Sequence, residues 1–412
     1  MRVCLLVLMI AMTVGCSDKS HMPKIGEWSA VMETMDEKKL PFLLTIRADE
    51  SITIYNGEET IEVDEITYKN DSIIIQMPVF EGVLKGKFTQ DSISGVFVKP
   101  SLNRVVPFVM KQGLSERFIV TSAPKADVQG VWETVFSPSN KEDRYIAKGI
   151  FDQKGHKVTG TFRTTTGDYR YLSGAVENDS LFLSTFDGAH AFLFEAKIEG
   201  DSVMDGMFYS GNHFKEPFTA KRNPNYELPK ADSLTFLKEG YDKIEFSFPN
   251  TKGEVVSLED DKFEDQVVIV QIMGTWCPNC LDETKYYTNY AKTSKPKNVE
   301  FISLAFEYAP TKEKAMASIN RLKEKVDVPY PILLAQYGSS DKKKANEKLP
   351  MLNHVLSYPT TIFIDKAGRV RKIHTGFNGP ATGEKYDQFV KEFESYVQML
   401  SDEVIPEVAE TE

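Results

Sequence analysis

The sequence predicts a multidomain protein in which two antiparallel β repeats, each a barrel or a sandwich, precede an α/β domain. Two observations support this fold class. In the first half of the chain, short motifs recur in the same order roughly 105 residues apart. In the C-terminal third, strand-like runs alternate with helix-like runs, which is typical of an α/β domain. A chain of 412 residues has room for two to three such units.

Composition excludes several classes of function. The formal charge is −11 and no long Lys/Arg block occurs, so we expect no nucleic-acid partner. No apolar run reaches the roughly 18 residues of a membrane-spanning helix. Four cysteines are too few for a disulfide scaffold of this length.

The N-terminus has the pattern of an export signal. A basic start is followed by a short apolar stretch and then by small residues that end at Cys16. The ending Thr-Val-Gly-Cys resembles a bacterial lipoprotein signal over residues 1–16, which implies that Cys16 becomes the lipidated first residue of the mature protein. The alternatives are a plain secretory signal and an uncleaved apolar tail. Residues 17–25 are then a tether, and we expect the chain in the cell envelope, lipid-anchored to a membrane and facing the periplasm or the exterior.

Residues 26–122 and 126–223 are predicted to be two copies of one module. Each copy predicts about eight short strands separated by turn-forming Asn-Asp-Ser or Gly-Asp-Ser clusters. Closing such strands into a barrel or sandwich would protect their edges. The recurring segments are Gly26–Trp28 with Gly130–Trp132, Asn70–Ile75 with Asn178–Leu183, Asp91–Phe97 with Asp201–Phe208, and Pro107-Phe108 with Pro217-Phe218.

Two kinds of residue in these modules have candidate roles. Trp28 and Trp132 begin the two copies, and we expect them to be core anchors rather than ligand-stacking residues. His156, His190 and His213 occur only in the second copy, so we expect solvated loop residues rather than a shared metal site. The pair of modules is expected to serve as a docking or spacing platform.

The α/β domain is predicted over residues 236–403, after a polar linker at 224–235 and before an acidic, disordered tail at 404–412. The expected strands are Val267–Met273, Val299–Leu304, Ile332–Ala335, Thr361–Ile364 and Val370–Ile373. The expected helices are Cys277–Tyr290, Lys312–Val326, Asp341–Leu349 and Gly383–Met399.

The motif Trp276-Cys277-Pro278-Asn279-Cys280 stands where the first of these strands meets its helix. Two cysteines at this spacing form a redox pair, half of a zinc site or a pair of inert core thiols. A structural zinc site needs about four ligands, and no second pair is present. At a helix N-terminus the Cys277 thiolate would be favoured, and Cys280, one turn later, could resolve a mixed disulfide.

Together with Tyr358-Pro359-Thr360-Thr361, this motif resembles thioredoxin-fold proteins of the TlpA/ResA-like branch, which are membrane-tethered thiol–disulfide oxidoreductases of bacterial envelopes. The hairpin-like segment at 246–258 is similar to an N-terminal extension of that branch. The β modules ahead of such a domain resemble envelope lipoproteins of Bacteroidetes type. The resemblance implies a redox disulfide between Cys277 and Cys280; we expect neither a cofactor nor a metal.

The same resemblance assigns further residues. Pro359 matches the cis-proline of the family, which frees the preceding backbone for a substrate chain. Glu283 matches an acid near the buried cysteine; with a raised pKa it could accept the Cys280 proton, whereas the alternative is a solvated helix acid. The predicted substrate-binding residues are Trp276, Tyr358, Pro359 and Thr360.

Two departures from the family pattern alter these expectations. Gln271 stands where thioredoxin has a buried acid, which shifts the proton role towards Glu283 or water. The proline expected a few residues after Cys280 is absent, so the helix is expected to lack the usual kink. Gly376 is expected to permit a close approach near the site, and His374 to be a strand-edge residue rather than a catalyst.

These patterns favour a thiol–disulfide oxidoreductase that reduces its partners. The implied partners are a disulfide-containing exported client, a membrane thiol donor that recharges the pair, and the membrane itself through Cys16. Two alternatives stay open: a peroxidase of the peroxiredoxin type, and a scaffold whose β modules recognise a glycan or an envelope protein.

Overall fold

The structure is a computed structural model that describes residues 22–113, 115–200 and 203–404. The predicted signal with Cys16, most of the tether and nearly all of the acidic tail lie outside the described residues. Among the described residues, no helix combines the length and the apolarity needed to cross a membrane.

Module 1 is a single antiparallel sheet that rolls up without closing. Its nine strands lie in the order β4-β3-β2-β1-β9-β8-β7-β6-β5. The first strand of the chain segment, β1, therefore pairs with the last, β9, and the sheet is open between β4 and β5. The strands are β1 Gly26–Glu33, β2 Lys39–Ile46, β3 Ile52–Asn56, β4 Glu59–Val63, β5 Ile66–Lys69, β6 Ser72–Gln76, β7 Val83–Phe88, β8 Ser92–Lys99 and β9 Arg104–Gln112.

Module 2 repeats this order and closes it. The sheet runs β11-β10-β18-β17-β16-β15-β14-β12-β13, and a further pairing of β11 with β12 joins its ends into a barrel. The strands are β10 Gly130–Phe136, β11 Tyr145–Lys154, β12 Lys157–Thr164, β13 Gly167–Asp168, β14 Leu172–Glu177, β15 Ser180–Phe186, β16 Ala191–Glu199, β17 Val203–Ser210 and β18 Phe214–Arg222. The described part of each module thus holds nine strands, not about eight; the two-residue β13 is too short to leave a sequence pattern.

The two tryptophans have equivalent places in the modules. Trp28 and Trp132 are both 0% exposed. Each indole N–H donates to the carbonyl of the residue four positions earlier, Lys24 at 2.9 Å and Val128 at 2.8 Å. A buried tryptophan with its N–H satisfied is a large contribution to a core. The prediction that they are core anchors is confirmed.

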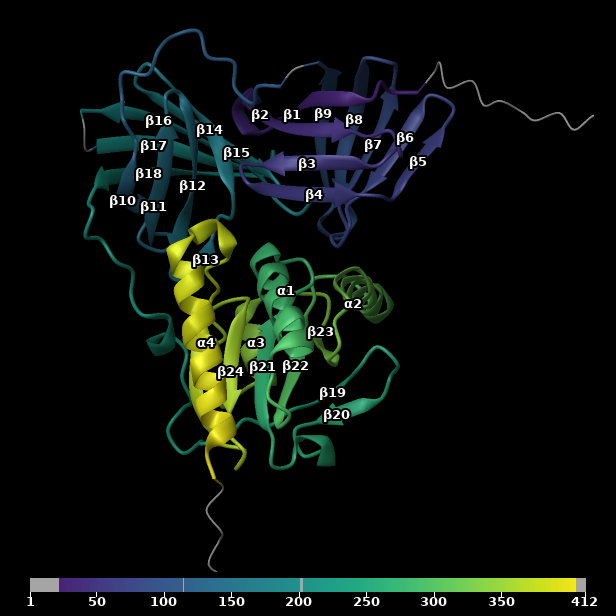
Figure 1. The fold of residues 1–412 in the computed structure, drawn as a ribbon, viewed down its shortest axis with the longest axis vertical. Helices are drawn as coiled ribbons and strands as arrows, with labels where there is room; N and C mark the ends of the chain where they lie inside the picture. The colour runs from purple at the N-terminus through teal and green to yellow at the C-terminus, as the bar shows by residue number, and fades with distance from the viewer. Residues whose placement is uncertain (1–21, 114, 201–202, 405–412) are drawn as a thin grey trace, which may run out of the picture.

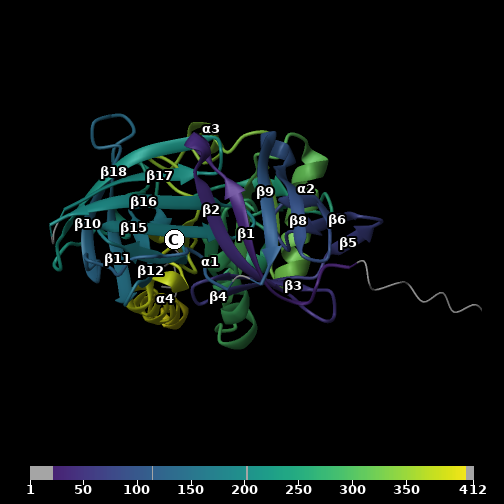
Figure 2. The ribbon, with the colours of Figure 1, turned by 90° about the horizontal axis from the view of Figure 1, so that it is seen from above.

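A side chain of module 2 completes the core of module 1. Phe186, at the end of β15, is 0% exposed, and its ring lies 4.6 Å from that of Phe42 and 5.1 Å from that of Phe97. The side chain of Asn56 holds the Phe186 backbone from both sides, donating to its carbonyl at 2.9 Å and accepting from its N–H at 3.1 Å. The modules therefore share a packed interface and lie side by side (Figure 2).

The C-terminal domain has the predicted α/β fold. A five-stranded sheet in the order β23-β22-β21-β24-β25 carries helices on its faces; β21, β22 and β23 are parallel, β24 runs antiparallel to β21, and β25 runs antiparallel to β24 (Figure 1). Its elements are β21 Val267–Met273, α1 Pro278–Thr293, β22 Val299–Phe306, α2 Lys312–Val326, β23 Ile332–Gln336, α3 Lys342–Lys348, β24 Thr360–Ile364, β25 Val370–Thr375 and α4 Glu384–Asp402. The fold prediction is confirmed, and α1 runs as one helix, as the absent proline suggested.

Smaller elements surround this sheet. The expected hairpin precedes β21 as β19 Ser247–Pro249 and β20 Val255–Ser257. Short 3₁₀ turns occur at Met35–Glu37, Pro100–Leu102, Ala231–Ser233, Asp261–Phe263 and Pro380–Thr382. Both modules sit over the end of the α/β domain at which α1 begins, so the junction of β21 and α1 lies beneath them (Figure 1).

Candidate active site

Cys277 is the N-cap residue of α1. Its Sγ accepts the backbone N–H of Cys280 at 3.2 Å, and Pro278 fills the first helical position, where no donor is needed. The Cys277 thiol also donates to the carbonyl of Tyr358 at 3.4 Å. Unpaired N–H groups and the helix dipole at this position favour a negative charge on sulfur. The geometry is therefore that of an attacking thiol.

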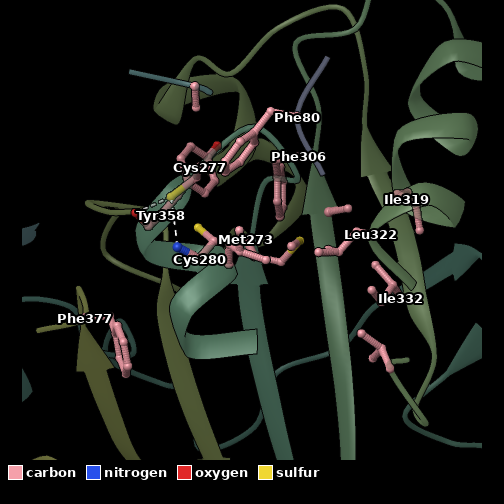
Figure 3. Packing of buried hydrophobic residues seen from close by; sticks show 14 of the residues in the cluster. Phe80, Met273, Cys277, Cys280, Phe306, Ile319, Leu322, Ile332, Tyr358 and Phe377 are labelled. Atoms are coloured by element: carbon pink, nitrogen blue, oxygen red, sulfur yellow. Dashed lines mark hydrogen bonds between the residues drawn. The ribbon is translucent and has the colours of Figure 1, made fainter. Parts of the chain in front are cut away.

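Cys280 lies one turn further and is completely buried, whereas Cys277 is 7% exposed. Both thiols are free in the structure (Figure 3). Burial raises the pKa of Cys280 well above its ordinary value, and the neighbouring Cys277 and Glu283 act in the same direction. Cys280 therefore needs a base before it can attack, as expected of a resolving cysteine.

Glu283 lies one turn further along α1 and is close enough to raise the pKa of Cys280. It is 0% exposed, which excludes the solvated helix acid, and burial raises its pKa to about 7. Its carboxylate accepts from Gln271 Nε2 at 2.8 Å, from Thr361 Oγ1 at 2.9 Å and from the Tyr287 hydroxyl at 3.1 Å. These donors hold the carboxylate in place, and near neutral pH about half of it is ionised.

Gln271 does not replace the acid but supports it. While its amide N–H₂ binds Glu283, its Oε1 accepts from Ser303 Oγ at 2.8 Å and from Thr284 Oγ1 at 3.2 Å. A fully bonded amide in a buried position fixes its neighbours without titrating. The shift of the proton role to Glu283 or water, inferred from sequence, stays a prediction.

The cis-proline loop faces the redox pair. The Tyr358–Pro359 peptide bond is cis, as predicted. The Trp276 ring lies 5.5 Å from that of Tyr358, and the Trp276 indole donates to the Phe306 carbonyl at 3.0 Å. Thr360 is 0% exposed, and its hydroxyl donates to the carbonyl of Ser357. Its side chain thus holds the loop instead of lining a groove.

A second buried acid beside the motif was missed by sequence reasoning. Glu307 follows β22 and is 1% exposed; its carboxylate accepts from the backbone N–H and from the hydroxyl of Thr275, each at 2.7 Å. Burial raises its pKa to about 7. Only its position directly after an apolar strand could have marked it. It braces the segment that leads into Trp276 and Cys277.

Module 1 also reaches this region. Glu81 accepts a hydrogen bond from the Tyr308 hydroxyl at 3.2 Å, and Tyr308 lies 5.5 Å from the Trp276 ring. Phe80, which belongs to the same buried cluster as both cysteines, is seen beside Cys277 in Figure 3. The redox motif is therefore covered by the loop between β6 and β7.

Module 2 covers the motif from another side, through the segment 163–170 around β13. The Asn279 amide, between the two cysteines, donates to the carbonyl of Asp168 at 3.1 Å. The Ser357 hydroxyl, next to the cis-proline loop, donates to the carbonyl of Thr166 at 2.8 Å. A Cβ on Gly376 would lie 2.6 Å from the Thr166 carbonyl carbon, so the expected close approach is to module 2.

Arg170 connects module 1, module 2 and the redox domain in one buried cluster. Its guanidinium is hydrogen-bonded to Glu59 of module 1, lies 3.2 Å from Asp282 of α1 and 3.5 Å from Asp187 of its own module. All four side chains are at most 11% exposed. Burial raises the pKa of Asp282 to about 6, against the opposing effect of Arg170. One cation thus neutralises several desolvated carboxylates at the junction.

The histidines among the described residues do not pair with the redox cysteines, although His190 borders the Arg170 cluster through Asp187. His213 is exposed, whereas His156 and His190 are half-buried, so the expectation of solvated loop residues is wrong for these two. His190 lies 3.3 Å from Asp187 and stacks on Phe192, which explains its burial. His374, near the C-terminal end of β25, pairs with Asp232 at 2.7 Å. No cluster of three or more metal-ligating side chains occurs among the described residues.

Fold and site together define a class of protein. A dithiol at a helix N-terminus, a buried second sulfur with a carboxylate near it, and a facing cis-proline on a five-stranded α/β sheet form a thiol–disulfide exchange centre. The chain is a thiol–disulfide oxidoreductase with a thioredoxin-like domain.

Comparison with known proteins agrees with this class. Residues 239–390, which make up most of the C-terminal domain, match the family described as Redoxin. The thioredoxin-like protein YneN of Bacillus subtilis (strain 168) is 29% identical over 34% of this chain and 73% of its own length. The thiol-disulfide oxidoreductase ResA of Halalkalibacterium halodurans is 23% identical over 38% of this chain and 80% of its own length. A solved thiol-disulfide oxidoreductase from Bacteroides fragilis NCTC 9343 is 19% identical, with 36% of this chain and 99% of that chain covered and a TM-score of 0.27.

Proposed function

We propose that this protein reduces disulfides of specific exported client proteins in the cell envelope, using Cys277 as the attacking thiol and Cys280 as the resolving thiol. The observation that carries the proposal is the asymmetry of the pair. Cys277 caps α1 and accepts a backbone N–H, while Cys280 is fully buried beside Glu283. Such a pair can transfer two electrons in two ordered steps.

The reaction balances without a cofactor. The Cys277 thiolate attacks one sulfur of a client disulfide, forms a mixed disulfide and releases the other client sulfur as a thiolate. Glu283 then takes the proton of Cys280, whose thiolate attacks the Cys277 sulfur. The second client sulfur leaves, the Cys277–Cys280 disulfide forms, and the client has gained two electrons.

A membrane location would supply the reductant for the next cycle. A lipid on Cys16 would tether the chain, and a membrane dithiol of matching chemistry would reduce the Cys277–Cys280 disulfide. The apolar export-type N-terminus supports this location, and so does the similarity to a protein named ResA. Tyr358 and Pro359 would present the backbone that pairs with the client.

Trapping the mixed disulfide tests the proposal. With Cys280→Ser, the second step is lost, and Cys277 should retain exported proteins through bonds that a reductant releases. The matched control is the Cys277→Ser, Cys280→Ser double variant, which should retain none. Absence of any trapped exported protein from the single variant would contradict the proposal.

A further inference from the structure

A cavity of ≈ 630 Å³ lies where both β modules meet the redox domain. The redox domain contributes Trp276 and Tyr308, which stand next to Cys277 and at the end of β22. The modules contribute an aromatic wall and several nitrogen-bearing side chains. This wall consists of Phe97, Tyr169, Phe192, Phe208 and Phe214, and the nitrogen-bearing side chains are Lys99, Arg104, His190 and His213. Neither module alone could form such a cavity.

The cavity has an excess of positive charge. Its lining includes Lys99 and Arg104 but no aspartate or glutamate. Lys99 is 8% exposed, and its ammonium donates to the carbonyl of Ala189 at 2.8 Å but pairs with no carboxylate of the described residues. Within the described part of the chain, Arg104 has no ion pair. A desolvated ammonium and a guanidinium without counter-ions favour an anionic occupant.

Nearby carboxylates are already engaged and do not neutralise this charge fully. Glu81 accepts from the Ser101 N–H and from the Tyr308 hydroxyl. Asp187 accepts from the N–H groups of Ala189 and His190. Burial lowers the pKa of Lys99 to about 8, with Arg104 acting in the same direction, so a bound carboxylate would raise this pKa again.

The position of the cavity links it to the exchange reaction. Trp276 both lines the cavity and precedes Cys277, and its ring contacts Tyr308 on one side and Tyr358 of the cis-proline loop on the other. When a client sulfur is bound to Cys277, the client residues next to that sulfur would lie against Trp276. Apolar side chains there would meet the aromatic wall.

We propose that this cavity binds an acidic segment adjoining the reactive disulfide of the client, with Lys99 and Arg104 holding its carboxylate. The inference rests on the proposed reductase function and names the class of client. It assigns the β modules a direct part in client recognition. Clients with neutral or basic flanking segments would lack the ion pairs and would react more slowly.

Three cyclic peptide disulfides test this proposal. They are identical except at two positions beside one cysteine, which are both Glu, both Gln or both Lys. The full chain with Cys4→Ser and Cys16→Ser carries Cys277 and Cys280 as its remaining thiols. Starting from the reduced chain, the second-order rate of peptide reduction is measured at low salt. We expect the Glu peptide to react about tenfold faster than the Gln peptide, because desolvated charge pairs stabilise an encounter complex. The Lys peptide should be slowest.

Variants then assign the effect to the cavity. In the Lys99→Gln, Arg104→Gln double variant, the preference for the Glu peptide should fall to about twofold or less. Arg104→Gln alone removes a side chain with no ion pair among the described residues, so it should lower the preference without loosening the modules. Lys85→Gln is the matched control, because Lys85 is exposed on β7 of the same module. It should keep the full preference.

Neutral 2-hydroxyethyl disulfide separates this proposal from the function on which it rests. Wild type and every variant should reduce it at the same rate, because it is too small and uncharged to use the cavity. If no form of the chain reduces any disulfide, the proposed function fails. If all reduce 2-hydroxyethyl disulfide but wild type shows no preference for the Glu peptide, or the double variant keeps that preference, the client inference is overturned.

Discussion

The two β modules repeat one strand order but differ in how they meet the redox domain. Module 2 is a closed barrel, and it contacts the redox motif through buried groups around Arg170 and Asp168. Module 1 is open between β4 and β5, and the connection at this opening pairs Asp64 and Glu65 with Arg321 and Lys325 of α2. Breaking a buried ion pair costs much more free energy of unfolding than breaking an exposed one, so the two attachments should differ in strength.

This difference shows which features of the module are the same in both copies and which have diverged. The tryptophan anchors and strand order are common to both copies because they build the core. The segments that touch the redox domain are not common to both copies: they include the β4–β5 connection and the β6–β7 loop in module 1, and the β12–β14 segment in module 2. Loops can diverge without cost to the core and so carry the function.

The largest effect is expected at the buried junction of module 2. Arg170→Met leaves Glu59, Asp187 and Asp282 without their cation, and it should lower the free energy of unfolding by about 3–5 kcal/mol. The deficit should be larger at pH 8 than at pH 5, because low pH protonates the carboxylates. Urea unfolding at both pH values measures it, and alkylation of Cys277 should become faster as its cover loosens.

Exposed Arg144, on the same module, provides the control for this change. Arg144→Met should change neither unfolding nor alkylation. An Arg170→Met chain as stable as wild type would show that module 2 is attached no more firmly than module 1.

A comparable effect is expected where module 2 enters the core of module 1. Phe186→Ala would leave a cavity against Phe42 and Phe97 and should cost about 3–5 kcal/mol of unfolding free energy. Loss of the ring should also separate the modules, so thermal unfolding should show two transitions in place of one. A single transition with unchanged midpoint would mean that module 1 does not depend on this side chain.

Sequence alone predicted the redox domain closely. The bounds of β21 and α2 match the prediction because an apolar run and a capping threonine mark them; the Thr311 hydroxyl accepts the N–H of Lys314. The cysteine pair and Pro359 were also found, since each lies in a local motif. Glu307 and Arg170 were not found, because their partners lie more than thirty and more than a hundred residues away.

The modules show the same limit. Turn clusters located the strands approximately, but closure depends on another pairing: β12 pairs with β14 in module 2, whereas β4 and β5 do not pair in module 1. No local pattern encodes this choice. The placement of the modules over Cys277 likewise depends on contacts between distant segments.

An intermediate effect is expected from a change that touches neither module. Glu283→Gln removes the base for Cys280 and should slow release of the client from the mixed disulfide by about 10- to 100-fold. Stopped-flow measurement of peptide reduction would resolve this step from the first attack, whose rate should be unchanged. An equal loss in both steps would argue for a merely structural role.

The pH dependence of stability gives an independent readout for Glu283. Its pKa is about 7 in the folded chain but about 4.5 when unfolded, so folding takes up a proton and stability falls as pH rises through this window. Glu283→Gln should therefore gain up to about 3 kcal/mol relative to wild type between pH 4.5 and 8. Glu347→Gln, on an exposed face of α3, should show no such gain.

The smallest effect is expected at the attachment of module 1. Lys325 pairs with Asp64 at 3.1 Å and with Glu65 at 2.8 Å, but these acids are 70% and 39% exposed. Lys325→Gln should cost less than about 1 kcal/mol, and salt should reduce even this difference. A loss as large as that of Arg170→Met would remove the contrast between the two modules.

The reduction potential of the Cys277–Cys280 pair tests the central proposal most directly. It can be measured by equilibrating the chain, with Cys4→Ser and Cys16→Ser, against a thiol buffer. A client reductase should have a potential near or below about −230 mV, in the range of thioredoxin-like reductants. A value of about −120 to −180 mV would place the pair with oxidants and isomerases, and it would contradict the reducing role.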